Sequence, residues 1–208
     1  MPGLSPTISC TLPSFGGQTS MVHRQLVEHT AEERLSLNRI GLWLFILSES
    51  FLFGAALSSR YYLQGVERPP ELNQLLGLGI TLVLLTSSLT AYRAERAALW
   101  GHLAGLNRNL AATIGLGLVF LVGVVIEWYE AFHYFPPNTA YGTIFLTTTG
   151  LHGFHVLTGI VALTFVLPLG RHGRFTGGNS WAVEGAVKYW HFVDVAWVFI
   201  YPTLYLVQ

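Results

Sequence analysis

Charged residues are scarce in this sequence. Only 11% of its 208 residues are charged, whereas 51% are hydrophobic, and the mean hydropathy is +0.48. A soluble globular domain normally carries about 25% charged residues. The low charge therefore argues against an ordinary soluble domain and predicts a membrane protein. The formal net charge is +0, so nothing favours nucleic acid as a partner.

Cysteine is almost absent, because Cys10 is the single one in the chain. One cysteine excludes a disulfide framework within the chain and a C-x-x-C-H haem attachment. It also excludes an iron–sulfur site built from thiolates and any copper site that needs two cysteines. We interpret Cys10 as a bystander in a polar N-terminal tail.

That tail covers residues 1–37 and is rich in proline, serine, threonine and glycine up to Ser20. It has neither the basic beginning nor the apolar core of a signal peptide. Residues 22–36 are more charged and could form a short helix at the membrane surface. A tail of this composition is usually disordered alone, so we expect it to be held against a partner subunit. We also expect it to lie on the cytoplasmic side.

Five apolar segments follow the tail, and each is near the ~20 residues that span a bilayer as a helix. Short links with glycine, proline and asparagine separate them. The sequence therefore predicts an all-α integral membrane protein, with five transmembrane helices in a bundle within a membrane domain of residues 38–208. The predicted segments are residues 38–59, 72–92, 109–128, 141–169 and 183–207.

The basic residues are distributed unevenly between the two sides of the predicted bundle. Nine lie on the side of the N-terminus, and only Arg60 and Arg68 lie on the other. Since cytoplasmic loops carry an excess of lysine and arginine, the N-terminus is predicted to be cytoplasmic and the C-terminus outside. The nine are Arg24, Arg34, Arg39, Arg93, Arg96, Arg108, Arg171, Arg174 and Lys188.

Several ionisable residues fall at membrane depth. Glu49 is central in the first segment, His152 and His155 in the fourth, and Asp194 in the fifth, with His191 one turn away. Placing an ionisable group in hydrocarbon costs about 2.5–3.5 kcal/mol on insertion scales. Since Glu49, His155 and Asp194 fall at similar depth, we expect them to converge in a buried polar junction. In it, Glu49 would pair with a histidine of the fourth segment.

Several chemistries fit this junction. Two histidines three residues apart share a helix face and cannot ligate both sides of a haem by themselves, although His191 could supply the second ligand. A metal site from His152, His155, Glu49 and Asp194 would satisfy ligand preferences. A Glu–His pair could also take up or pass a proton. Our main interpretation is a clamp, in which these groups bond across helices, with or without lipid, at about 0.6–2 kcal/mol each.

Four motifs resemble subunit III of the haem–copper cytochrome c oxidases, and they occur in that family's order. Residues 44–49 are similar to the segment with the family's carbodiimide-reactive glutamate. Residues 127–131 look like its acidic motif, which holds Glu127 and Glu130 at the outer end of the third segment. Residues 149–156 are similar to its Gly-Phe-His-Gly-Leu-His motif. Residues 189–197 resemble its terminal-helix signature. The four sequences are LFILSE (residues 44–49), EWYEA (127–131), TGLHGFHV (149–156) and YWHFVDVAW (189–197).

The resemblance implies a subunit without its own redox centre in an oxidase of the aerobic respiratory chain. Haems and copper would belong to partner subunits, and the complex would reduce dioxygen to water and translocate protons. This subunit would stabilise catalytic subunit I, bind phospholipid and support proton uptake. The complex would lie in a bacterial plasma membrane. Glu49 would be the family's buried glutamate, with His152 or His155 as its neighbour, and Asp194 would pair with His191.

Longer members of the family have seven helices, whereas this sequence predicts five. The electron donor to the complex would be cytochrome c or quinol. The alternatives are therefore subunit III of a quinol oxidase and the related subunit of a nitric oxide reductase. A proton-coupled secondary transporter is the alternative from another class, but it predicts inverted repeats and helices broken at mid-membrane, and the sequence shows no convincing repeat.

Overall fold

The computed structural model describes the backbone of residues 16–62, 69–70, 72–171 and 181–207. Side chains are described from residue 32 onward, except for residues 63–68, 71, 169–180 and 208. The chain divides into two compact units, Met1–Ile40 and Gly41–Gln208. The sites that follow all lie within the second unit.

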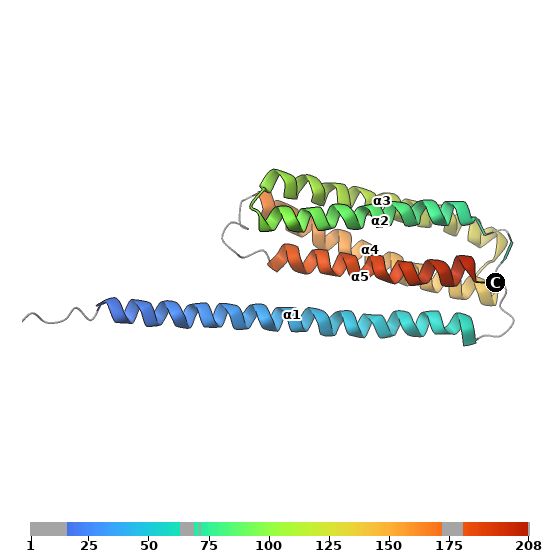
Figure 1. The fold of residues 1–208 in the computed structure, drawn as a ribbon. Coiled ribbons are helices and arrows are strands. Elements are labelled where there is room, and N and C mark those ends of the chain that lie inside the picture. Colours follow the sequence, from blue (N-terminus) through green and yellow to red (C-terminus); the bar gives the residue numbers. More distant parts are fainter. Residues whose placement is uncertain (1–15, 63–68, 71, 172–180, 208) are drawn as a thin grey trace, which may run out of the picture. The chain divides into compact units, whose positions relative to one another are not determined.

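The described part of the chain is helical. It consists of α1 (Gly16–Tyr62), α2 (Gln74–Leu99), α3 (Leu103–Tyr134), α4 (Ala140–Arg171) and α5 (Trp181–Tyr201) (Figure 1). A π-helical turn, η1 (Pro202–Leu206), continues directly from α5. The prediction of an all-α architecture is therefore confirmed.

Within the described residues, four helical stretches are long and apolar enough to cross a membrane. They are Glu32–Tyr62, Gln74–Leu99, Leu103–Tyr134 and Ala140–Pro168. The 21-residue helix α5 is not among them and carries Glu184, Lys188 and Asp194. These spans are those of a multi-pass membrane protein.

The helices are longer than the apolar segments read from the sequence. The predicted segment 38–59 lies inside α1, which begins at Gly16, within the predicted polar tail. Helix α3 has 32 residues, or about 48 Å at 1.5 Å per residue, against a hydrocarbon core of about 30 Å. Helical hydrogen bonding does not stop where apolar residues stop, so the helices are longer than the apolar segments alone.

Helices α2 to α5 form a closed ring of neighbours. Helix α2 packs against α3, α3 against α4, and α4 against α5, and α5 returns to α2. Figure 1 shows these four helices side by side as a bundle. Their buried residues include the fully enclosed side chains of Phe120, Phe145, Leu163 and Trp190.

Trp190 is the residue on which three neighbouring helices meet. A Cβ added to Gly117 of α3 would lie 2.6 Å from its Cη2, and one added to Gly159 of α4 would lie 2.9 Å from its Cε3. Its indole Nε1 donates to Ser87 Oγ of α2 at 3.0 Å. The two glycines therefore allow α3 and α4 to approach the buried ring, in line with the use of small residues between membrane helices.

Candidate functional site

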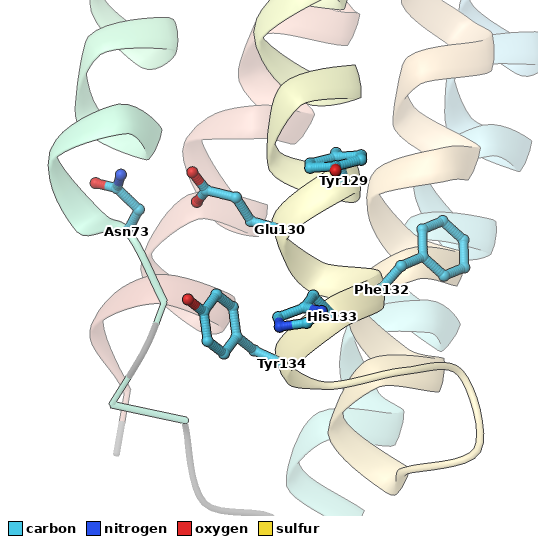
Figure 2. Close-up of a pocket in the computed structure, with 6 residues that line it drawn as sticks. All are labelled: Asn73, Tyr129, Glu130, Phe132, His133 and Tyr134. Atoms are coloured by element: carbon cyan, nitrogen blue, oxygen red, sulfur yellow. The ribbon is translucent and has the colours of Figure 1, made fainter.

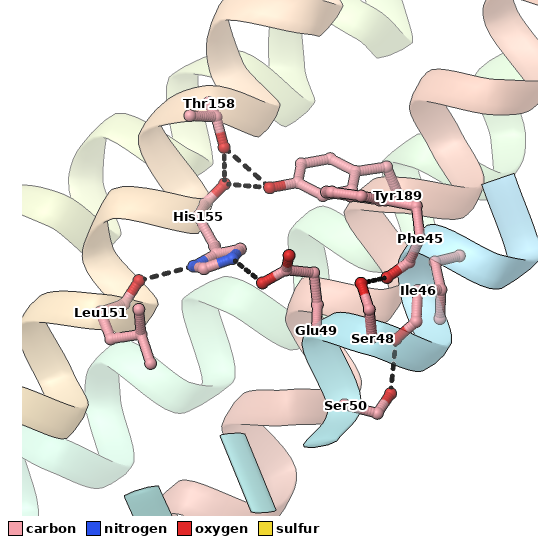
Figure 3. Close-up of polar contacts among 9 residues, drawn as sticks. All are labelled: Phe45, Ile46, Ser48, Glu49, Ser50, Leu151, His155, Thr158 and Tyr189. Carbon is pink, nitrogen blue, oxygen red and sulfur yellow. Dashed lines mark hydrogen bonds and ion pairs between the residues drawn. The ribbon is translucent and has the colours of Figure 1, made fainter. Parts of the chain in front are cut away.

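Glu49 and His155 are brought together between α1 and α4. His155 Nε2 lies 3.1 Å from Glu49 Oε2, and its Nδ1 lies 2.7 Å from the Leu151 carbonyl oxygen (Figure 3). A carbonyl only accepts, so Nδ1 carries a proton and donates to it. The remaining contact then holds one proton between Nε2 and the carboxyl group, as imidazolium–carboxylate or as imidazole–carboxylic acid.

A shell of aromatic and hydroxyl groups surrounds this pair. Tyr189 on α5 places its hydroxyl 2.7 Å from Thr158 Oγ1 and 3.4 Å from the His155 carbonyl oxygen (Figure 3). The buried ring of Phe53 lies 5.0 Å from the imidazole of His155. The Glu49 side chain remains 20% exposed while that of His155 is 7% exposed. The carboxyl group therefore lies at the open side of the pair.

Asp194 and His191 form a second, separate group with Ser88 of α2. His191 Nδ1 lies 2.8 Å from Ser88 Oγ and 3.8 Å from Asp194 Oδ2. Both carboxylate oxygens of the buried Asp194 lack a hydrogen-bond partner among the described residues. Serine and aspartate both approach the same imidazole nitrogen, so the three do not have the geometry of a Ser-His-Asp triad, in which each takes a different nitrogen.

His152 lies in an aromatic environment, apart from both pairs. It is fully buried, and the rings of Trp197, Phe120 and Phe53 have centroids 4.8, 5.5 and 6.2 Å from its own. Neither of its nitrogens has a hydrogen-bond partner among the described residues. The five predicted residues thus form two pairs and one isolated histidine. Within the described structure, no hydrogen bond or ion pair joins the three groups.

The acidic motif divides between the interior and the surface. Glu127 is buried, and its Oε2 accepts a 2.7 Å hydrogen bond from the hydroxyl of Tyr205 in η1. Glu130, one turn later, is half-buried and lines an open pocket with Asn73, Tyr129, His133 and other residues (Figure 2). Sequence reasoning missed Tyr205, because no local pattern identifies a donor 78 residues away.

The C-terminal turn is bonded to several other helices. The Tyr141 hydroxyl of α4 donates to the Leu204 carbonyl at 2.7 Å, and Gln74 Nε2 of α2 donates to the Tyr205 carbonyl at 3.1 Å. Arg60 Nη2 of α1 lies 3.3 Å from the Val207 carbonyl. Backbone carbonyls that end a helix have no partner within it, and here the side chains of other helices supply one.

The described residues contain no group of three histidine, cysteine, aspartate or glutamate side chains that could hold a metal ion. Both nitrogens of His155 already have partners, Leu151 and Glu49. The contact between Glu49 and His155 joins α1 to α4.

Comparison with known proteins gives the same family over most of the chain. The family model described as "Cytochrome c oxidase subunit III" matches residues 19–208. The chain is 34% identical over 187 residues to the "Probable cytochrome c oxidase subunit 3" of Nocardia farcinica, which covers 83% of this chain and 92% of the relative. It is 35% identical over 192 residues to the "Cytochrome c oxidase subunit 3" of Corynebacterium diphtheriae, or 86% and 92% of the two chains.

A longer relative matches as well. The "Cytochrome c oxidase subunit 3" of Oryctolagus cuniculus is 34% identical over 179 residues, which are 80% of this chain and 68% of the relative. The resemblance read from the four motifs is therefore confirmed, and it places the chain in a membrane-bound oxidase complex. The chain belongs to the cytochrome c oxidase subunit III family.

Proposed function

We propose that this chain stabilises the catalytic subunit I of its oxidase and supports proton uptake during the reduction of dioxygen to water. Haems and copper would reside in partner subunits, and cytochrome c would be the donor to the complex, as the names of the relatives suggest. The observation that carries the proposal is the Glu49–His155 contact of 3.1 Å between two helices. The same contact serves both attachment and proton exchange.

The proton role follows from the arrangement of this pair. Its carboxyl group is 20% exposed and its imidazole is nearly buried, so a proton can arrive at Glu49 while His155 stays in place. Since Nδ1 of His155 is fixed on the Leu151 carbonyl, only Nε2 exchanges a proton with the carboxyl group.

The proposed topology is five membrane crossings with a cytoplasmic N-terminus and an outer C-terminus, in a bacterial plasma membrane. Its support is the nine-to-two bias of basic residues and the place of α5 in the ring, between α2 and α4. Two of the charged groups of α5, Glu184 and Lys188, form an ion pair with each other. A helix whose charges are paired or buried in the bundle can cross despite its composition.

Bound phospholipid and stabilisation of the catalytic subunit complete the proposal. The membrane portion of α1 exposes Trp43, Leu44, Leu47 and Phe51, which provides an apolar face for a partner helix or acyl chains. The Glu49–His155 and His191–Asp194 pairs would hold the helices that carry such faces and contact lipid headgroups where they are open. The N-terminal tail, residues 1–37, would lie on the cytoplasmic side; residues 1–15 of it fall outside the described residues.

The test is Glu49→Gln in the whole oxidase complex, reconstituted in vesicles. We expect reduction of the haems to proceed at an unchanged rate, because the redox centres are in other subunits, whereas turnover to water should slow because each water formed consumes protons. Proton uptake, followed with a pH-sensitive dye, should slow several-fold, since the amide cannot accept the proton from solution. Ser48→Ala is the control, because Ser48 is the preceding residue on α1 and its hydroxyl donates within the same helix, to the Phe45 carbonyl at 2.8 Å.

Two results would contradict the proposal. Equal proton-uptake rates in the Glu49→Gln and Ser48→Ala complexes would remove the proton role. Loss of haem reduction in a fully assembled Glu49→Gln complex would show that this subunit takes part in electron transfer, contrary to the proposed division of labour.

A further inference from the structure

The three helices that meet at the candidate site have fixed relative directions. Helices α1 and α5 are parallel, because earlier residues of α1 contact earlier residues of α5. Helix α4 is antiparallel to both, because its later residues contact the earlier residues of α5. The site therefore has two ends, one toward the start of α5 at Trp181, which we call the Trp181 end, and one toward its last residue, Tyr201, the Tyr201 end. The contacts are Phe45–Tyr189, Phe53–Phe192, His152–Trp197 and Gly159–Trp190.

Hydroxyl groups lie on the side of the Glu49–His155 pair that faces the Trp181 end. Thr158, one turn along α4 from His155, places its Oγ1 2.7 Å from the hydroxyl of Tyr189. Both hydroxyls approach the His155 carbonyl oxygen, at 2.9 and 3.4 Å. Figure 3 shows that the oxygen of Glu49 not bonded to His155 points to the side on which these hydroxyls lie. This side of the pair therefore offers groups that can both donate and accept a hydrogen bond.

Aromatic rings lie on the opposite side of the pair, toward the Tyr201 end. The ring of Phe53 is 4% exposed, and its centre lies 5.0 Å from that of His155 and 6.0 Å from that of Phe192. His152, one turn further, is surrounded by rings, and neither of its nitrogens has a hydrogen-bond partner among the described residues. The bond from His155 Nδ1 in this direction ends at the Leu151 carbonyl, which accepts and has no proton to pass on.

We infer that the Glu49–His155 pair exchanges protons with one end of the bundle alone, the Trp181 end, past the hydroxyls of Thr158 and Tyr189. This inference rests on the proposed proton role of Glu49 and adds its direction. In the proposed topology the Trp181 end is the cytoplasmic one. A proton from water at that end forms the O–H bond of the Glu49 carboxylic acid, and the same bond breaks when the proton moves to His155 Nε2 or returns.

One-sided access has a functional reason. A buried acid–base pair that is open to both ends would carry protons across the membrane and dissipate the gradient that a proton-translocating complex builds. The ring of Phe53 and the aromatic surrounding of His152 close the Tyr201 end. The pair can therefore hold a proton for the complex without becoming a leak.

The experiment uses the oxidase complex in vesicles whose inner and outer pH are set separately. Dicyclohexylcarbodiimide enters from the lipid and reacts with protonated carboxyl groups, and mass spectrometry of the peptide that contains Glu49 gives the labelling rate. We expect this rate to rise as the pH falls at the Trp181 end, by up to about tenfold per pH unit, the limit for a single proton. The pH at the Tyr201 end should not change it.

A cysteine label identifies the two ends in the vesicles. Ala104→Cys, in a Cys10→Ser background, places the single cysteine of this subunit on an exposed position in the first turn of α3. That turn follows the end of α2 and lies at the Trp181 end, because α2 is antiparallel to α5. The contacts that show this are Ser88–His191 and Gln74–Tyr205. A membrane-impermeant maleimide then reports whether the Trp181 end faces the outer solution.

The route is tested with Tyr189→Phe/Thr158→Val, which removes both hydroxyls and keeps the shapes of the side chains. We expect proton uptake by the complex, followed with a pH-sensitive dye, to slow several-fold toward the value of Glu49→Gln. The matched control is Tyr201→Phe/Thr86→Val. Tyr201 stacks on Tyr205 at the other end of α5, and Thr86 bonds within α2 to the Leu82 carbonyl. Uptake in the control should match the parent, and both single variants are measured with subunit content and thermal stability.

The possible outcomes separate this inference from the proposed function. Labelling of Glu49 that follows the pH at the Tyr201 end, or at both ends, would overturn the one-sided access and leave the proton role intact. Labelling that follows the pH at neither end would overturn the proton role itself. Equal uptake rates in Tyr189→Phe/Thr158→Val and its control would overturn the assigned route past the two hydroxyls.

Discussion

The membrane portion of α1, residues 41–62, and the ring of α2 to α5 are held in different ways. In residues 41–62 only Phe53 and Arg60 are buried. In the ring, each helix has a face of buried side chains, and Trp190 contacts glycines of two neighbouring helices. The ring is therefore stabilised by dense packing over its whole length, whereas α1 is attached at a few points.

Those few points are polar or aromatic. They include the Glu49–His155 contact, the ring of Phe53 beside His155, and bonds from Arg60 and Tyr61 to the C-terminal segment. In lipid, apolar surface gives no drive for helices to associate, so packing and hydrogen bonds decide. A helix attached in this way keeps most of its apolar surface for lipid or a partner, and its polar residues specify its position.

The largest difference between the two regions is expected for tryptophan. Trp190→Ala should reduce the free energy of unfolding by about 3–5 kcal/mol, because it leaves a large cavity between three helices. Trp43→Ala on α1 should change it by less than about 0.5 kcal/mol, since Trp43 is 59% exposed. Unfolding of the purified subunit in mixed micelles measures both values. Equal losses would contradict the contrast between the ring and α1.

A glycine pair within one helix tests the packing of the ring with smaller changes. Gly117→Ala should destabilise by about 1–3 kcal/mol, because its Cβ would lie 2.6 Å from a buried indole atom. Gly115→Ala has open space around the new Cβ and should be neutral or slightly stabilising, since alanine favours helix. The same unfolding measurement applies, and a larger loss at Gly115 would mean that the tight contact is not at Trp190.

The smallest effect is expected for the polar attachment of α1. In a double-mutant cycle of Glu49→Gln and His155→Asn, the coupling energy should be about 0.6 kcal/mol and at most about 1.7 kcal/mol, the range for polar pairs between membrane helices. Ser50 serves as the control position, because its hydroxyl bonds within α1 to Ile46. A coupling energy near zero would show that this contact does not hold α1 to α4.

The sequence predicted the apolar part of each helix because apolar length is a local property, but it did not predict where the helices end, since α1 begins at Gly16 within the predicted tail. It also placed Glu49 beside a histidine of the fourth segment, since a carboxyl group at membrane depth needs a polar partner. It did not distinguish His155 from His152. Residues three apart on a helix differ by about 60° in direction. Because of this difference, His155 contacts Glu49 whereas His152 lies beside the ring of Trp197.

The hydrogen-bond partners of Glu127 and His191 could not be predicted from the sequence either. The hydroxyl of Tyr205 reaches Glu127 from a π-helical turn, a backbone form that the sequence pattern did not indicate. Ser88 approaches His191 from another helix, 103 residues earlier in the chain. Both contacts depend on how two helices are rotated and shifted against each other.

By itself, the sequence determined that this chain spans a membrane, which segments are helical, and which family it belongs to. These follow from composition, from apolar length and from four local motifs. Only the tertiary structure decided how the polar residues are divided, with Glu49 at His155, Asp194 near His191, and His152 between aromatic rings. The physical reason is that solvation cost can be read from one residue, whereas a partner is fixed by the packing of whole helices.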